Sequence, residues 1–203
     1  MSELIPPGGW RQPPQPRLQA PPPAERGWLF RLASHFSRRL GRADVPDVIT
    51  VLHLNPRLFW AWLFFASRLM PYGRLPARER ELVILRTAWN CRSRYEWGQH
   101  VEIGLRSGVT DDEVLRITQG PDAFAGRPEQ WLLSACDEIC AQQFITDATW
   151  QHLASRYDRK RLIEILMLVG HYIMIAAFLN SAGLLLEPPI EDKLQALHAR
   201  IRA

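Results

Sequence analysis

Two acidic residues and a histidine form the pattern in this sequence that is best suited to chemistry. Glu96 and His100 are four residues apart, a spacing that puts both side chains on one face of a helix and within reach of each other. Glu81 adjoins the apolar run 82–85, and if it points inward its carboxylate is desolvated and holds a proton more tightly. A buried carboxylate near an imidazole is equipped for general acid–base catalysis.

Each of these residues also has a purely structural interpretation. Ser93 and Glu96 match the S-x-x-E capping box, in which the glutamate only holds the start of a helix. Glu81 could be an exposed partner of a neighbouring arginine, and His100 could be a structural residue with its hydrogen bonds satisfied. Spacing alone leaves these alternatives open.

The three residues lie on two helices joined by a short break. The segment 78–108 predicts a helix, a tight break near Asn90 to Ser93, and a second helix ended by Gly108. Two helices joined in this way pack as a hairpin or a sharp corner. Glu81 lies about ten residues before the break, roughly 15 Å along its helix, which brings it level with His100. We therefore expect Glu81, Glu96 and His100 to converge on one pocket.

Helix signals recur along the rest of the chain, and strand signals do not. Asn55-Pro56, the Thr110–Glu113 capping box and Asp158 each mark a helix start, and Gly183 can end the long apolar helix that follows Asp158. No stretch alternates apolar and polar residues, and no Asn-Gly or Asp-Gly hairpin signal occurs. The sequence predicts an all-α fold of about seven or eight helices.

The N-terminal segment differs in composition from the rest of the chain. Residues 1–27 hold eight of the sixteen prolines, which predicts an extended or disordered tail that contributes little to the core. Residues 28–203 are predicted to form one helical domain. Seven arginines and two glutamates precede residue 44, so the net charge of +4 resides in the tail region and the body is nearly neutral. A nearly neutral body predicts no nucleic-acid partner.

No segment predicts a membrane span or a metal site. The most apolar stretch, 163–179, contains Glu164, His171 and Tyr172, which favours a buried helix over a span. No signal-peptide pattern opens the chain, so we expect a cytoplasmic protein. His171 and Tyr172 are second-rank candidates for the pocket, because buried polar side chains need partners. No zinc-type spacing is found, so neither a metal nor a cofactor is expected.

The run ERELVILRTAWNC and the following YEWGQHVEIGLRSGVTDDEV resemble the central signature of the carboxymuconolactone decarboxylase and alkyl hydroperoxidase AhpD superfamily. The resemblance covers residues 46–187 and leaves the tail outside. It implies an AhpD-like helical fold and a homo-oligomer, either a dimer, a trimer or a hexamer. The sequence adds a helix that is apolar on nearly all its faces, which must be covered by its own domain or by a neighbour; its aromatic residues are Trp60, Trp62, Phe64 and Phe65.

The peroxidase branch of this superfamily uses a C-x-x-C pair that this sequence lacks. Counted back from His100, the two cysteine positions fall on Ser93 and Glu96, while the glutamate falls on Glu81. Cys91 lies two residues too early and has no partner at that spacing. It is either a reactive single thiol, whose pKa a nearby helix N-terminus would lower, or a partly buried bystander. Cys136 and Cys140 are four residues apart on a predicted helix and are interpreted as core residues.

The decarboxylase branch has a feature that this sequence keeps. Its second helix resembles W-x-E-x-x-x-H, and Glu96 and His100 match the last two positions, which implies proton transfer on a small lactone acid. Arg86 and Arg94 are candidate anchors for a substrate carboxylate only by their proximity in sequence. The aromatic residues Trp89, Tyr95 and Trp97, with Trp60 and Trp62 on the earlier helix, suggest a cavity lined by rings, with core packing as the alternative.

Three hypotheses follow. The leading one is an enzyme of cofactor-free acid–base chemistry, a lyase or isomerase, in which Glu81 or Glu96 works with His100 on a small apolar or carboxylated molecule. The reaction would be decarboxylation, lactone opening or isomerisation. The second is a thiol peroxidase, or its relic, with Cys91 as the sole nucleophile. The third is a non-catalytic oligomeric protein that binds a small ligand.

Overall fold

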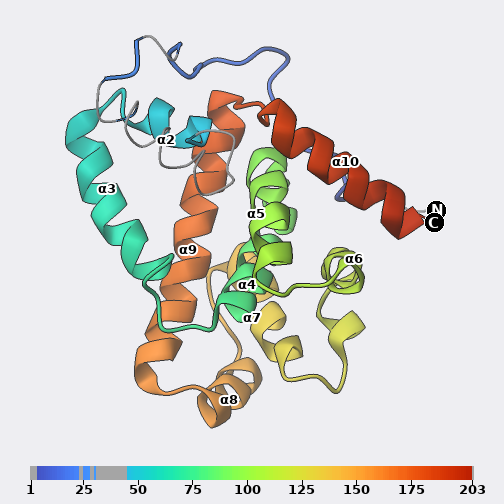
Figure 1. The fold of residues 1–203 in the computed structure, drawn as a ribbon. Coiled ribbons are helices and arrows are strands. Elements are labelled where there is room, and N and C mark those ends of the chain that lie inside the picture. Colours follow the sequence, from blue (N-terminus) through green and yellow to red (C-terminus); the bar gives the residue numbers. More distant parts are fainter. Residues whose placement is uncertain (1–3, 23–24, 28–29, 31–44, 203) are drawn as a thin grey trace.

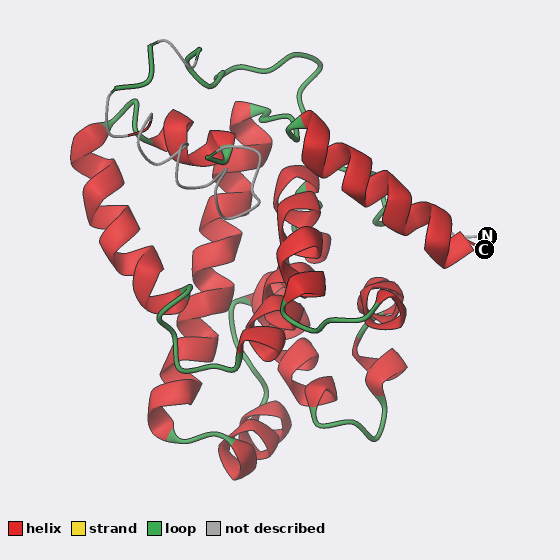
Figure 2. Cartoon of the chain, viewed as in Figure 1, coloured by secondary structure: helices red, strands yellow, loops and turns green. Residues whose placement is uncertain are grey.

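The computed structural model describes residues 4–22, 25–27, 30 and 45–202, and within them every regular element is a helix (Figure 2). Most of the segment 28–44, where the helical pattern was expected to begin, lies outside the described residues. The described part holds nine α-helices and one short 3₁₀ helix, close to the seven or eight predicted. They are α2 (Asp47–Leu52), α3 (Pro56–Leu69), α4 (Ala77–Asn90), α5 (Arg94–Arg106), α6 (Asp111–Gln119), η1 (Pro121–Phe124), α7 (Glu129–Gln142), α8 (Asp147–Arg156), α9 (Arg159–Ala182) and α10 (Pro188–Arg202).

The helix boundaries follow the capping signals in the sequence. Asn55 accepts a hydrogen bond from the Leu58 amide at the start of α3, and Asp158 accepts one from the Arg161 amide at the start of α9. Thr110 and Glu113 form both hydrogen bonds of a capping box on α6. These side chains satisfy amide groups that have no partner within the helix.

Helix α4 lies at the centre of the fold and packs against α5, α7 and α9 (Figure 1). Residues 79–89 of α4 are all buried, which is unusual for a helix that carries four charged side chains in this stretch. One apolar cluster joins α4 to α7 and α9, and a second joins it to α5, α6 and α10. The helices of both clusters therefore fix the position of α4 and of the break that follows it.

Helix α9 is long and apolar enough to cross a membrane by length and composition alone. In the structure it packs against α4, α5 and α7, and more than half of its most apolar window is buried inside the protein. Glu164 on this helix accepts hydrogen bonds of 2.8 Å from the amides of Arg74 and Leu75. These contacts are those of a core helix, as the sequence predicted.

The described part of the N-terminal segment is extended, as predicted, but it is packed onto the helical body. The Arg11 amide donates to the carbonyl of Arg92 in the α4–α5 break at 2.9 Å. The ring of Trp10 contacts those of Trp89 and Trp97, with centroids 5.6 and 6.1 Å apart. Leu4 is also buried. The expectation that this segment contributes little to the core is therefore wrong, because an extended backbone can still place an indole in an apolar site.

Candidate active site

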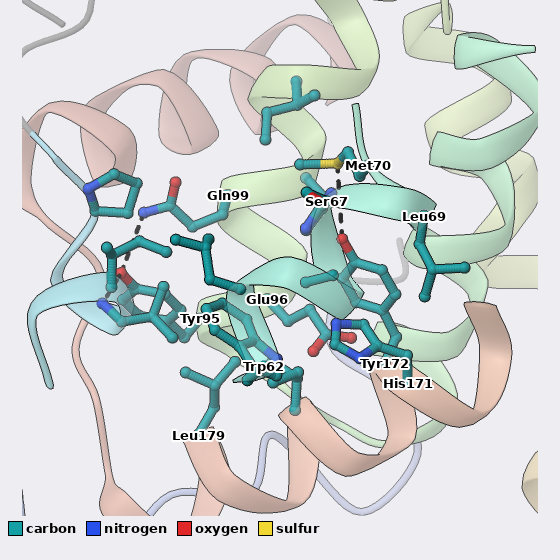
Figure 3. Close-up of a pocket in the computed structure, with 18 of the residues that line it drawn as sticks. Trp62, Ser67, Leu69, Met70, Tyr95, Glu96, Gln99, His171, Tyr172 and Leu179 are labelled. Atoms are coloured by element: carbon teal, nitrogen blue, oxygen red, sulfur yellow. Dashed lines mark hydrogen bonds between the residues drawn. The ribbon is translucent and has the colours of Figure 1, made fainter. Parts of the chain in front are cut away.

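A cavity of about 300 Å³ lies between α3, α5 and α9, with α2 at one end (Figure 3). Its walls are mostly apolar, and no lysine or arginine of the described residues lines it. Polar atoms reach it from a small set of side chains, namely Trp62, Ser67, Tyr95, Glu96, Gln99, His100, His171 and Tyr172. A mostly apolar cavity with a few convergent polar groups is typical of a binding site for a small molecule.

The α4–α5 hairpin brings Glu81 and His100 into contact behind this cavity. Glu81 Oε2 lies 2.8 Å from His100 Nδ1, and Glu81 Oε1 accepts from Arg80 Nε at 3.1 Å. Glu81 is fully buried and His100 nearly so. Glu81 and His100 are in contact across the hairpin, as expected, but of the three candidate residues only His100 and Glu96 line the cavity, and Glu81 lies behind it. The alternative in which Glu81 is an exposed partner of an arginine is wrong, because Glu81 and Arg80 are both buried.

These contacts orient the imidazole of His100. A carboxylate that also accepts from a guanidinium is suited to accept from an imidazole N–H, and in this arrangement His100 Nδ1 donates to Glu81. His100 Nε2 is then the ring nitrogen free to take a proton from a molecule in the cavity. The edge of the neighbouring Tyr172 ring, 5.0 Å from the imidazole by centroids, limits how the His100 ring can turn.

Glu96 lies one helical turn before His100 and has a different environment. Its side chain is buried, and neither carboxylate oxygen has a hydrogen-bond partner. Ser93 is the N-cap of α5 but makes no side-chain capping bond, so the capping-box interpretation is wrong. Burial, with a smaller contribution from the charge of Cys140, raises the pKa of Glu96 well above its ordinary value. Glu96 therefore faces the cavity as an uncharged carboxylic acid.

Two further buried polar atoms on the cavity wall lack partners. They are Nε1 of Trp62 and Nδ1 of His171, whose rings stack with centroids 6.1 Å apart. Burial, and then the charge of His100, lowers the pKa of His171 to about 4, so its ring is neutral at neutral pH. Tyr172 donates only to the thioether of Met70, a weak acceptor at 3.7 Å. Figure 3 shows Trp62, His171 and Tyr172 beside Glu96.

Comparison with known proteins supports the family resemblance. Residues 56–136 match the carboxymuconolactone decarboxylase family, a region that contains α4, α5 and both candidate carboxylates. Among curated proteins, none matches the chain by sequence. An alkylhydroperoxidase AhpD core protein from Ralstonia eutropha JMP134, described as peroxidase-related, is 18% identical with a TM-score of 0.74, over 88% of this chain and 95% of that one. Within residues 56–136 the chain is therefore similar to the carboxymuconolactone decarboxylase family, and its fold is similar to that of the AhpD core protein.

Two other solved structures are similar at 14% identity and a TM-score of 0.73. One is a cysteine-to-alanine variant of the debrominase Bmp8 in complex with 2,3,4-tribromopyrrole, matched over 91% of this chain and 98% of that one. The other is a peroxidase-related protein from Silicibacter sp. TM1040, matched over 89% and 96%. At this identity the likeness establishes the AhpD-like fold of the chain and not its reaction.

Several side chains near the site have structural roles. Tyr95 accepts from the Val48 amide at 3.1 Å and donates to Glu187 at 2.6 Å, so it ties α2 and the segment before α10 to α5. Gln99 donates to the same glutamate at 2.5 Å. Sequence reasoning missed Glu187 and Gln99, and no local spacing links residues so far apart along the chain.

The candidate anchors for a substrate carboxylate do not reach the cavity. Arg86 donates to both carboxylate oxygens of Asp137, at 2.5 and 2.7 Å, and to the Ile117 carbonyl at 2.6 Å. Arg94 pairs with Glu191 at 2.7 Å on the other side of α5. Both arginines are therefore occupied elsewhere, and their closeness to the motif in sequence was misleading.

The ring-lined cavity was predicted in part with the right aromatic residues. Tyr95 from α5 and Trp62 from α3 line the cavity, whereas Trp60 does not. Trp89 and Trp97 pack together beneath Trp10 in the core, and neither lines the cavity. Core packing, the alternative interpretation, is correct for the two tryptophans because they point from α4 and α5 away from α3.

The cysteines are arranged differently from the C-x-x-C of the peroxidase branch, whose positions hold Ser93 and Glu96 here. Cys91 is half-buried, and its thiol is close enough to that of Cys140 on α7 to interact with it. This interaction, followed by burial, raises the pKa of Cys91, which is opposite to the lowering that the reactive-thiol alternative requires. Cys136 is fully buried, as predicted. No cluster of metal-binding side chains occurs among the described residues.

Proposed function

We propose that this protein is an enzyme of cofactor-free acid–base chemistry that acts on a small, uncharged and mainly apolar organic molecule. One observation carries the proposal: Trp62, Glu96 and His171 present buried polar atoms without partners to the same cavity. A buried polar atom without a partner costs free energy, and such exceptions in a folded protein call for an explanation. A ligand that hydrogen-bonds to these atoms supplies one.

Each residue has a role that follows from its contacts. His100 Nε2 removes a proton from the substrate, and Glu81 orients the imidazole through Nδ1 and stabilises its charged form. Arg80 holds the other oxygen of Glu81 through a hydrogen bond from Nε. Glu96, as a carboxylic acid, donates a proton or a hydrogen bond to a substrate oxygen. A base and an acid one helical turn apart suit proton removal at one substrate atom and proton delivery at another.

The charge of the cavity narrows the choice of reaction. No cation among the described residues lines the cavity, and burial of an unpaired carboxylate is costly. This favours lactone opening or isomerisation over decarboxylation, which requires a substrate carboxylate. The structurally similar debrominase was solved with 2,3,4-tribromopyrrole, a small ring without a carboxylate, which supports an uncharged ring as ligand here.

The test compares turnover of lactones, muconate-type acids and hydroperoxides by the wild type and by His100→Ala. We expect turnover of an uncharged lactone or its isomer, lowered about 10²- to 10⁴-fold by His100→Ala. His152→Ala, on the surface of α8, is the matched control and should leave the rate unchanged. Binding without turnover would indicate the ligand-binding hypothesis. Turnover of hydroperoxides alone, lost in Cys91→Ser, would indicate the thiol peroxidase hypothesis.

We also propose that the protein is a homo-oligomer formed through the outer face of α3. Leu58, Trp60 and Phe64 are 59, 48 and 66% exposed on this helix. Large apolar side chains clustered on a surface are typical of an interface with another protein. Light scattering at micromolar concentration should give a dimer, trimer or hexamer, and the double variant Trp60→Ser/Phe64→Ser should shift the mass toward the monomer. A monomeric wild type would contradict the proposal.

A further inference from the structure

The end of α4 and the middle of α7 bring two cysteines together that lie 49 positions apart in the sequence. Asn90, the last residue of α4, donates to Asp137 on α7 at 2.7 Å. Cys91 follows Asn90 directly, and Cys140 lies one turn after Asp137, so this contact places the two cysteines at the same level. Their thiols are close enough for each to shift the pKa of the other, and both side chains are half-buried rather than enclosed.

The surroundings of the two sulfur atoms differ. The interaction with Cys91 is the main cause that lowers the pKa of Cys140, and the Asn90 side chain and the positive charge of Arg86 add to it. Cys140 is therefore the thiol that ionises first, while Cys91 keeps its proton. Cys136 contrasts with both, because it is fully buried and contacts the carbonyls of Val83 and Leu132.

We propose that Cys91 and Cys140 form a dithiol site that is oxidised reversibly to a disulfide by low-molecular-weight disulfides. A pair of adjacent thiols, one of them ionised, has both the nucleophile and the resolving group that thiol–disulfide exchange requires. The acid–base chemistry proposed above uses neither cysteine, so this site is independent of it. The pairing joins two helices and is therefore unlike a C-x-x-C motif, whose two cysteines lie on one helical turn.

The electron balance of the exchange is closed by the external disulfide. The Cys140 thiolate attacks one sulfur of the disulfide, breaks its S–S bond, and forms a mixed disulfide while one small thiolate leaves. The sulfur of Cys91, as its proton passes to that thiolate or to water, then attacks Cys140 and releases the second small thiol. Two protein thiols are oxidised and one external disulfide is reduced to two thiols. An external dithiol reverses both steps.

The oxidised form would fasten the α4–α5 break to α7 directly behind the cavity. Glu96 on the cavity wall is close enough to Cys140 for the charge on that sulfur to raise the pKa of Glu96. A disulfide removes this charge, so oxidation of the pair should lower the pKa of Glu96, the acid of the proposed active site. This effect of Cys91–Cys140 oxidation on Glu96 does not depend on the identity of the substrate.

The experiment equilibrates the full-length native protein with reduced and oxidised glutathione over a range of ratios. The reduced chain has three free thiols, and we expect one to remain after oxidation, with the loss of two hydrogen atoms in the mass. Digestion with trypsin together with a protease that cleaves before aspartate separates Cys136 from Cys140 at Asp137. The linked peptides should contain Cys91 and Cys140.

Single variants distinguish a resolving pair from two independent thiols. Cys91→Ser and Cys140→Ser should each stop at a stable glutathione adduct or remain reduced, while Cys136→Ala should still form the link. Circular dichroism checks that each variant is folded. If a variant is unfolded, the peptide map of the wild type still tests the Cys91–Cys140 link. Three free thiols in the wild type at the most oxidising ratio, a link that includes Cys136, or a glutathione adduct without a link would each overturn the proposal.

Discussion

The two carboxylates of the α4–α5 hairpin are equally buried and have opposite surroundings. Glu81 is 0% exposed and is held by Arg80 and His100, while Glu96 is 2% exposed and has no hydrogen-bond partner. The first is a carboxylate whose oxygens both have partners, and the second is one whose pKa burial raises. The difference shows that depth alone does not decide the charge of a carboxylate, because the partners within reach do.

The same contrast separates the two sides of the candidate site. Behind the cavity, the charged side chains form a closed set of ion pairs and hydrogen bonds that keeps one geometry. On the cavity side, Trp62, Glu96 and His171 keep free polar atoms that a ligand can use. The site thus combines a base that is held in place, His100, with an acid that has no hydrogen-bond partner, Glu96. Neither side of the cavity provides both.

Removal of Glu81 should have the largest effect on stability. Glu81→Ala leaves the guanidinium of Arg80, itself 7% exposed, without its carboxylate partner. We expect the free energy of unfolding to fall by about 3–5 kcal/mol, the usual cost of breaking a buried ion pair by removing one member. Urea unfolding at pH 7 measures this loss.

Glu191→Ala is the matched control, because Glu191 also pairs with an arginine but both side chains are 31% exposed. A pair of this kind contributes about 1 kcal/mol or less. If the two variants lose similar stability, Arg80 has found another partner, and the Glu81–Arg80 pair does not contribute more to the free energy of unfolding than a surface pair does.

Replacement of Glu96 should have an intermediate effect that depends on pH. The pKa of Glu96 is raised in the folded state above its ordinary value of 4.5, so above that pH the unfolded chain is ionised while the folded protein keeps the proton. The wild type should therefore lose stability as the pH rises above 4.5 through the folded pKa, by at most about 1.4 kcal/mol per pH unit for this one proton.

Glu96→Gln cannot ionise and should lack this loss. Urea unfolding of both proteins between pH 4 and pH 8 gives the difference between their stabilities at each pH, from which titrations shared by both proteins cancel. We expect the variant to gain on the wild type as the pH rises. A stability difference that stays constant over this range would show that the pKa of Glu96 is not raised in the folded protein. The contrast drawn here between Glu96 and Glu81 would then be wrong.

Replacement of His171 should have the smallest effect at neutral pH and a visible one in acid. Burial lowers the pKa of His171 from 6.5 to about 4, so the unfolded chain binds a proton at a higher pH than the folded protein does. Its contribution to stability is complete above pH 6.5 and is lost as the pH falls toward 4. His171→Phe, beside Trp62 and Phe65, should remove this acid sensitivity, whereas His152→Phe on the surface should not. An unchanged acid profile would mean that His171 binds a proton inside the cavity.

Local sequence signals determined the helices and part of the site. Asn55, Thr110 and Asp158 cap helices as predicted because a capping bond spans only three residues and needs no tertiary contact. The Glu81–His100 contact was also predictable, since a hairpin of two regular helices sets which residues lie level. The S-x-x-E spacing suggested a capping box at Ser93, but the Ser93 side chain makes no capping bond. Local spacing does not report whether such a bond forms.

The sequence by itself determined an all-helical chain, a hairpin that carries two carboxylates and one imidazole, and the absence of cysteines at the two peroxidase positions. Only the tertiary structure decided which groups find partners. Trp62 reaches the cavity from α3 and His171 from α9, and Cys140 meets Cys91 across α4 and α7. The physical reason is that periodicity and capping act within a few residues, whereas hydrogen-bond partners and desolvation depend on helices that are distant in the chain and adjacent in space.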